Sequence, residues 1–176
     1  MASTQELLNK PASVGVWKVD PGRSTIGFKA KSMWGLASVK GSFKDFDGDG
    51  QITNTQTVFG RIDIKAASVD TKIGKRDEHL RSADYFEADK YPGISVVVTG
   101  AEAIDGDNVD LRAQLTVKST TTPLLLQAKV VVLDDSSVRV SAQATIDRRD
   151  FGVEGNLIGM IGDKATISGD VVFRRG

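Results

Sequence analysis

The side chains best suited to chemistry gather in one short stretch of the chain, over residues 69–93. Arg76, Asp77 and His79 follow one another closely there, and His79 is the one histidine of the sequence. An arginine can hold a phosphate or carbonyl oxygen, and a histidine can donate a hydrogen bond or move a proton. The structural alternative is that Asp77 pairs with Arg76 or with backbone and ties down a loop. The stretch therefore predicts the mouth of a site, a capping loop with a short helix, or both.

Residues 45–52, with the sequence DFDGDGQI, resemble the first part of a calcium-binding EF-hand loop. Three aspartates alternate with other residues, and Gly50 stands at the sixth place, where that loop turns sharply. The twelfth place is Gln56, which lacks the carboxylate that grips the ion through two oxygens. The flanking residues also alternate as strands do, whereas an EF-hand needs helices. We therefore predict a tight acidic turn at residues 45–50 and no metal site.

Composition narrows the class of protein. With 176 residues the chain is long enough for one domain with a substantial core. The absence of cysteine excludes disulfides and thiolate chemistry, and the single histidine excludes metal sites built on several histidines of one chain. Lysine and arginine together number 23, as do aspartate and glutamate, so the net charge gives no reason to expect nucleic acid or an anionic membrane surface as a partner.

The beginning of the chain does not predict a signal peptide. Residues 1–15 are polar and mixed, and they lack the apolar run of a signal peptide. No stretch of the sequence approaches the ~20 apolar residues of a membrane span. We therefore expect a flexible tail over residues 1–15, one domain over residues 16–176, a cytoplasmic location and no stable insertion into a membrane.

Alternation of apolar and polar residues dominates the remainder of the chain and is typical of half-buried strands. It is clearest over residues 109–117 and recurs over residues 25–30, 38–43, 58–69, 94–98, 124–132, 138–146 and 165–173. Polar segments such as residues 105–108 and 134–137 separate these runs as turns. A meander of about eight antiparallel strands commonly closes into a barrel, which removes its edges. We predict an all-β protein with a short helical insertion.

Many residues on the apolar faces of the predicted strands are small. They are Ala30, Gly41, Ala113, Ala128, Ala142, Ala144, Ala165 and Gly169. An eight-stranded barrel has an interior that side chains just fill, or that holds one small ligand. The small residues favour an open cavity, which costs stability unless a ligand occupies it. The alternative is a filled interior, in which phenylalanine and leucine side chains reach across.

Several motifs in register resemble the YceI-like family of isoprenoid-binding proteins. They include Trp17-x-Val19-Asp20-Pro21, Val39-x-Gly41-x-Phe43, Arg76-Asp77-x-His79-Leu80, Ala83-Asp84-Tyr85-Phe86 and Arg148-x-Asp150-Phe151-Gly152. The likeness spans about residues 16–174. It implies an extended antiparallel eight-stranded barrel, similar to the lipocalins, whose apolar interior takes a long polyisoprenoid chain or a related amphiphile. The chain departs from the family at Lys118, where glycine is usual.

The resemblance also implies a role for each candidate residue. The ligand would be an isoprenoid quinone or a polyprenyl phosphate, bound for carriage, storage or protection, with no cofactor and no catalysis. The cavity wall is expected to include Phe28, Phe43, Ile62, Ile64, Leu80, Phe86, Leu115, Val117, Ala142 and Phe151. Arg76, Asp77 and His79 would form a polar mouth beside the head group of the ligand.

Two other functions stay open at this point. An enzyme acting on such a lipid would use His79 as an acid or base, with Asp77 orienting the ring. A single histidine with no nucleophile beside it is weak evidence for that reading. An interaction protein would have a filled barrel and would meet its partner through charged loops.

The remaining predictions concern the surface. Arg148, Arg149 and Asp150 are interpreted mainly as an ion-pair cluster at the end of a strand. The apolar loop over residues 152–163 could be a lid, a portal in transient contact with a membrane, or a packed segment. Exposed apolar positions such as Trp34 and Leu125 could form a patch, so a homodimer also stays open.

Overall fold

A computed structural model of the chain describes residues 4–32, 37–153 and 161–176. The position of Trp34 and most of the loop over residues 152–163 lie outside the described residues, so the patch and the lid predicted there stay predictions. Within the described ranges, no helix combines the length and the apolar character that a bilayer span requires.

In the described part of the chain, eleven strands join into one sheet, and each pairing is antiparallel. The strands are β1 (Gly15–Val19), β2 (Thr25–Ser32), β3 (Ala37–Phe43), β4 (Phe46–Ile52), β5 (Val58–Lys65), β6 (Val69–Asp70), β7 (Gly93–Asp105), β8 (Asn108–Val117), β9 (Thr120–Asp134), β10 (Ser137–Asp147) and β11 (Ile161–Arg175).

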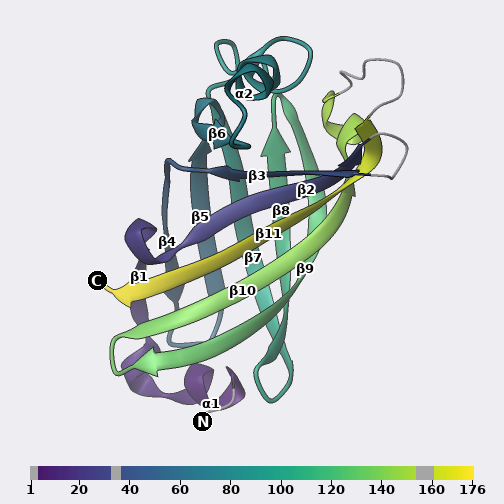
Figure 1. Cartoon of the computed structure of the whole chain (residues 1–176). Helices are drawn as coiled ribbons and strands as arrows, with labels where there is room; N and C mark the ends of the chain where they lie inside the picture. The colour runs from purple at the N-terminus through teal and green to yellow at the C-terminus, as the bar shows by residue number, and fades with distance from the viewer. Residues whose placement is uncertain (1–3, 33–36, 154–160) are drawn as a thin grey trace.

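Short helices interrupt or cap these strands. They are α1 (Thr4–Asn9), η1 (Pro11–Ser13), η2 (Pro21–Arg23), η4 (Ala66–Ser68), α2 (Gly74–Arg81) and η5 (Arg148–Phe151). The helix predicted within residues 69–93 is α2. The two α-helices lie at opposite ends of the molecule, α1 below and α2 above in the view of Figure 1.

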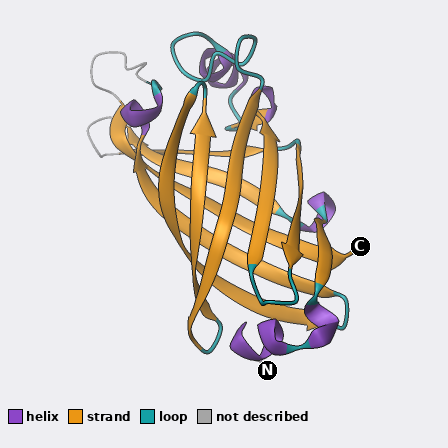
Figure 2. Ribbon diagram, turned by 180° about the vertical axis from the view of Figure 1, so that it is seen from behind, coloured by secondary structure: helices purple, strands orange, loops and turns teal. Residues whose placement is uncertain are grey.

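Eight of the described strands close into a barrel (Figure 1). The order around the ring is β1-β4-β5-β7-β8-β9-β10-β11, and β11 returns to pair with β1, so that Trp17 lies opposite Arg175. From β7 to β11 each strand pairs with the next along the chain, as a meander requires. The view from behind shows the same curved wall of long strands (Figure 2). The predicted all-β, lipocalin-like barrel is confirmed.

Along the edge that faces away from β10, the long strand β11 pairs with two strands in succession. Its residues 165–170 lie opposite β2, and its residues 173–175 lie opposite β1. The helix η2 separates β1 from β2, so the first wall strand is interrupted rather than continuous. β2 then pairs with β3, and β3 with β6, which carries the sheet beyond the ring towards α2.

The acidic segment at residues 45–52 is a strand, and the prediction of a tight turn at residues 45–50 is wrong. Residues 46–52 form β4, which pairs with β5 and β1. The turn comes later, at residues 53–57, where Gln56 adopts a positive φ of 64°. Gly48 is glycine because a Cβ there would collide with the backbone carbonyl oxygen of Arg61 on β5. Glycine in this segment therefore permits close approach of strands and does not make a turn.

The segment before the barrel carries a short helix, and the flexibility expected of it stays a prediction. Residues 4–9 form α1, and Leu7 is buried in a small cluster with Trp17 and Val138. The indole Nε1 of Trp17 donates a hydrogen bond to the carbonyl oxygen of Ser13, at 2.9 Å, which holds η1 against β1. Over the described residues 4–15 the chain therefore covers one end of the barrel.

Candidate ligand-binding cavity

A cavity of about 330 Å³ lies inside the barrel. Each of the eight strands of the ring contributes to its lining, as do β2 and β3. Leu7 and Leu8 of α1 line it at one end, and Leu80 of α2 lines it at the other. The cavity thus runs along the barrel between the two helices, and its volume falls within the ~300–1,000 Å³ that is usual for small-molecule sites.

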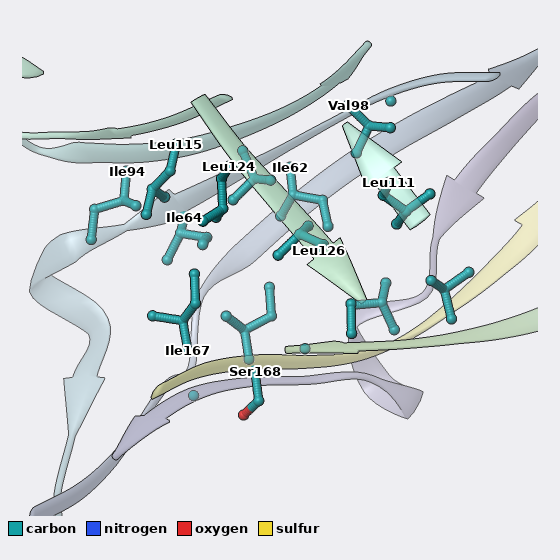
Figure 3. A pocket seen from close by; sticks show the side chains of 18 of the residues that line it. Ile62, Ile64, Ile94, Val98, Leu111, Leu115, Leu124, Leu126, Ile167 and Ser168 are labelled. Atoms are coloured by element: carbon teal, nitrogen blue, oxygen red, sulfur yellow. The ribbon is translucent and has the colours of Figure 1, made fainter. Parts of the chain in front are cut away.

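The walls of the cavity are built from aliphatic side chains on inward-facing strand positions. Figure 3 shows Ile62 of β5 and Leu126 of β9 on one wall, with Ile167 of β11 projecting toward them from the opposite wall. Ser168 follows Ile167, and its hydroxyl points away from the interior (Figure 3). Alternation along each strand therefore keeps apolar groups inside and polar groups outside, as the sequence pattern predicts.

All ten residues predicted for the cavity wall line the cavity. These are Phe28, Phe43, Ile62, Ile64, Leu80, Phe86, Leu115, Val117, Ala142 and Phe151. Side chains therefore do not fill the interior. The interaction-protein alternative had required a filled interior. Contact of these residues with a ligand stays a prediction.

Three aromatic rings close the cavity near α2. Phe86, which follows α2, contacts Phe43 of β3 at a centroid distance of 5.7 Å and Phe28 of β2 at 6.3 Å, both edge to face. The Phe28 and Phe43 rings lie 5.8 Å apart. Room for the Phe28 ring comes from Gly41, where a Cβ would lie 2.5 Å from the ring's Cζ. Glycine at this inward position is therefore a packing requirement.

The charged side chain at the cavity wall is Arg148, and it was assigned a different role from the sequence. Among the described lining residues it is the one that carries a charge. It is buried, and its Nη1 donates a hydrogen bond to the carbonyl oxygen of Val153 at 2.6 Å. The signal that could have revealed it is the alternation of β10, because Ala142, Ala144, Ile146 and then Arg148 share one face.

The neighbouring residue Arg149 does form ion pairs at the end of β10, but its partners among the described residues are Asp147 and Asp163 and not the predicted Asp150. Its guanidinium lies 2.8 Å from the Asp147 carboxylate and 3.5 Å from that of Asp163. The Asp147 side chain also accepts a hydrogen bond from the Arg149 backbone N–H, which caps η5. The hydrogen bond from the Arg149 side chain is the main reason that the pKa of Asp147 lies well below its usual range. This pair fixes η5, and η5 positions Arg148 and Phe151 at the cavity.

Tyr85 lines the cavity beside the arginine. Burial raises the pKa of the Tyr85 phenol, while the positive charge of Arg148 acts in the opposite direction. Its ring packs edge to face against His79 at a centroid distance of 5.0 Å. The polar end of the cavity wall is thus formed by Tyr85 and Arg148, close to α2.

The residues predicted to form a polar mouth do not line the cavity. Asp77 is buried, and its Oδ1 accepts hydrogen bonds from the backbone N–H and the hydroxyl of Thr71, at 2.7 and 2.6 Å. Arg76 donates to the Thr71 hydroxyl oxygen at 2.8 Å and to its carbonyl oxygen at 2.9 Å. The expectation that Arg76 and Asp77 face a ligand is therefore corrected, because both side chains are directed to Thr71 and tie α2 to the residue that follows β6.

His79 is on the outer side of α2. Its Nε2 lies 2.8 Å from the Asp84 Oδ2, and both side chains are substantially exposed. It is not among the residues that line the cavity. The ring is therefore not part of the cavity wall, and its contact with a head group at the mouth stays a prediction.

The turn that carries Lys118 lies beside the loop that follows α2 and the segment that follows η5. Lys118 adopts a positive φ of 56° between β8 and β9, a conformation that glycine adopts more easily. Its Nζ donates to the carbonyl oxygen of Gly152 at 3.1 Å and lies 3.8 Å from a carboxylate oxygen of Glu87. The lysine thereby links the loop after α2 to the segment after η5.

Comparison with known proteins assigns the chain to a family. The model of the YceI-like domain matches residues 17–173, almost the whole barrel. The chain belongs to the YceI-like family. The resemblance drawn from the sequence motifs is thereby confirmed.

Individual relatives agree with this assignment. Protein YceI of Escherichia coli O17:K52:H18 is 32% identical over 130 residues, which cover 70% of this chain and 68% of that protein. The crystal structure of BcnA from Burkholderia cenocepacia has a TM-score of 0.80 at 20% identity, covering 88% of this chain and 98% of BcnA. A polyisoprenoid-binding domain from Saccharophagus degradans has a TM-score of 0.76 at 19% identity, covering 91% of this chain and 98% of that domain. These structures share the fold of this YceI-like barrel.

The acidic side chains of the described residues do not gather into a candidate metal site. Within residues 4–32, 37–153 and 161–176, no group of three or more acidic or histidine side chains gathers as a metal site would require. In the segment that resembles a calcium loop, Asp45 pairs with Lys65 at 3.2 Å, and Asp47 accepts a hydrogen bond from the Gly48 backbone N–H. These aspartates lie at or along β4 and do not converge around a loop.

Proposed function

We propose that this YceI-like barrel binds one long polyisoprenoid or a related amphiphilic lipid, such as an isoprenoid quinone or a polyprenyl phosphate, for carriage, storage or protection. The observation that carries the proposal is the elongated aliphatic cavity between α1 and α2. Membership of the family and the likeness to a polyisoprenoid-binding domain support the choice of an isoprenoid chain.

The driving force would be burial of the apolar chain of the ligand. Each 100 Å² of apolar surface removed from water contributes about 2.5 kcal/mol. The aliphatic wall, which extends over all eight ring strands, therefore supplies most of the affinity, and the length and shape of the chain determine selectivity. Small side chains keep the bore open, with Ala142 on β10 lying opposite Ala128 on β9 and Gly169 on β11.

The polar end of the ligand would lie near Arg148. The guanidinium is the charge at the cavity wall, and its positive charge favours a carbonyl, hydroxyl or phosphate oxygen over hydrocarbon. Tyr85 lies at the same end and offers a phenol to the same oxygen. The head group would then lie toward α2, and the end of the isoprenoid tail toward α1.

We propose a binding role in preference to a catalytic one. The enzyme alternative relied on His79 as acid or base, but that side chain pairs with Asp84 on the outer side of α2. A group outside the cavity cannot reach the reacting atoms of a lipid within it, because a general acid or base acts at hydrogen-bond distance.

Mass spectrometry of an organic extract tests the proposal directly. One sample of the purified protein is extracted with solvent, and a delipidated sample is extracted as the control. A second portion of the delipidated protein is then reloaded with a quinone or a polyprenyl phosphate. A stoichiometric isoprenoid in the extract, or thermal stabilisation of the delipidated protein by the added lipid, is the expected result. An empty extract together with no stabilisation would overturn the proposal.

A cavity-filling variant sharpens this test. Ala142→Phe places a ring in the bore, and a loss of about 60 Å² of ligand contact weakens binding about tenfold. The matched control is Gln143→Phe, because Gln143 is exposed on the outer face of the same strand. Lipid binding that falls equally in both variants, measured by fluorescence titration, would contradict the interior site.

A further inference from the structure

The outer face of β2 and β3 gathers lysines while the chain as a whole is neutral. Lys29 and Lys31 on β2 and Lys40 on β3 are exposed there, and Lys44 follows at the end of β3. The two strands lie side by side next to β11 on one side of the barrel (Figure 1). We call Lys29, Lys31, Lys40 and Lys44 the lysine face. It concentrates positive charge that the equal totals of acidic and basic residues conceal.

Two of these lysines lie so close together that their positive charges repel each other. Lys29 and Lys40 lie directly opposite each other across the β2–β3 pair. Like charges in such cross-strand positions destabilise a sheet, whereas an acidic residue at either position would stabilise it. The arrangement is therefore better suited to an external anion than to the stability of the barrel.

Neighbouring groups do not neutralise the centre of the lysine face. Within the described residues, Lys29, Lys31 and Lys40 take part in no ion pair, whereas Lys44 lies 3.9 Å from Asp70 at the margin. The residues beside them on the same surface, Ser38 and Ser42 on β3 and Thr166 and Ser168 on β11, are uncharged. By contrast, the basic residues of β5 are paired, with Arg61 2.9 Å from Asp63 and Lys65 3.2 Å from Asp45.

The inner face of the same two strands belongs to the cavity. Phe28 and Ala30 of β2 and Val39 of β3 alternate with the lysines and line the lipid cavity. One layer of sheet therefore separates the lysines from the place where the ligand would lie. A protein that exchanges lipid must approach the surface in which that lipid dissolves, and cytoplasmic-type leaflets with anionic lipids attract clustered lysines.

We propose that the lysine face docks this protein onto the surface of an anionic phospholipid bilayer. The choice of a bilayer rests on the proposed lipid-binding function, together with the character of the face itself. Serine, threonine and glycine separate its lysines, so its described part offers no aromatic platform on which nucleic-acid bases stack. It also offers no large apolar anchor of the kind that dominates protein–protein interfaces. Headgroup phosphates require only the clustered charge.

Vesicle sedimentation tests the docking surface with the full chain after delipidation. The vesicles contain phosphatidylcholine alone, or phosphatidylcholine with phosphatidylglycerol, at low and at high salt. We expect binding to the anionic vesicles only, weakening as salt screens the charges. A lysine near an anionic surface contributes about fivefold in affinity, so the Lys29→Gln, Lys31→Gln, Lys40→Gln triple variant should bind about a hundredfold more weakly.

A matched control separates the lysine face from net charge. Lys10→Gln, Lys18→Gln and Lys129→Gln remove three exposed lysines elsewhere, and binding of this variant should stay close to that of the parent. Equal losses in both triple variants would overturn the proposal, as would absence of binding to anionic vesicles. Tighter binding to a single-stranded oligonucleotide or to polyglutamate than to the vesicles would also overturn it, in favour of those partners.

The outcome is independent of the cavity. Adsorption to vesicles is measured with empty protein, and lipid uptake of the lysine triple variant is measured in detergent solution, where no bilayer is needed. Uptake that persists while adsorption is lost supports the docking surface. If the parent protein adsorbs to anionic vesicles but takes up no lipid, the result would contradict the proposed function and leave the docking surface standing.

Discussion

At the α2 end of the barrel the closure combines aromatic packing with a partly buried hydrogen-bond network, whereas at the α1 end Leu7 packs into a small apolar cluster. Around α2, Asp77 and Arg76 are bound to Thr71, and Arg81 donates to the carbonyl oxygen of Ala67 at 2.8 Å. Around α1, a helix of six residues covers the opening by placing Leu7 against Trp17 and Val138. A helix that short does not hold its shape without such packing.

The two ends should therefore respond differently to a ligand. Breaking a buried hydrogen-bond network leaves polar groups unsatisfied, so the α2 end is costly to open. Separating Leu7 from its apolar cluster exposes apolar surface without breaking a network of this kind around Leu7, so we expect the α1 end to open more easily. We expect a lipid tail to enter and leave past α1, while the α2 end retains the head group.

The largest effect expected from a single change is at the α2 end. Asp77→Ala removes the acceptor of two hydrogen bonds and leaves the buried donors of Thr71 unsatisfied, which should lower the free energy of unfolding by about 3 kcal/mol. Chemical denaturation measures this loss. Asp84→Ala, whose exposed carboxylate contacts His79, is the control and should cost less than about 1 kcal/mol. An Asp77→Ala variant of unchanged stability that no longer binds lipid would restore Asp77 to the predicted polar mouth.

The next effect concerns the α1 end. Leu7→Ala removes most of a buried side chain and should lower the free energy of unfolding by about 2 kcal/mol. The same change should speed the release of bound lipid, followed by stopped-flow fluorescence, because α1 then covers the opening less firmly. Lys10→Ala, an exposed position just beyond α1, should leave release unchanged. Faster release from Asp77→Ala than from Leu7→Ala would reverse the assignment of the two ends.

The smallest expected effect is a difference between the two ends in how stability depends on pH. The folded pKa of Asp147 lies below its unfolded value, so its ion pair stabilises the protein above about pH 4. That contribution is lost as the pH falls through the lower, folded pKa. The difference in unfolding free energy between the parent protein and Asp147→Asn should therefore shrink in acid. The difference caused by Leu7→Ala should not change, because its packing partners Trp17 and Val138 do not titrate in that range. A pH-independent Asp147→Asn difference would show that the ion pair adds nothing to the α2 end.

The barrel could be predicted from the sequence because period-2 alternation survives in nearly every strand. Residues 109–117 were predicted as a strand, and β8 spans Asn108–Val117. The cavity-wall positions followed from the same alternation. Alternation did not reveal β4 as a strand, because glycines, Gly48 and Gly50, occupy inward positions there. Glycines and aspartates indicate turns locally, and only the close approach of β5 to β4 explains them as strand residues.

The polar residues of the site were harder to predict, because spacing does not reveal the direction of a side chain. Arg76 and Asp77 are close in sequence to residues of the cavity end, yet Thr71 is their partner. Arg148 carries the charge at the cavity wall because the alternation of β10 continues by one more position. The net charge likewise could not reveal the clustered lysines, because it does not depend on which strands pair. The lysines meet only when Lys29 and Lys40 face each other across two strands.

The pairing of the first wall strand with the last has a consequence for how the chain folds. β1 meets β11 through Trp17 and Arg175, which lie near opposite ends of the sequence. Contacts of such long sequence separation form late, because the loop between them must be ordered first. During synthesis the ring therefore stays open until β11 has emerged, and β1 and β10 each present an unpaired edge meanwhile. The interval before closure is when this chain is most exposed to aggregation, and it is also when the aliphatic interior is most accessible to a lipid.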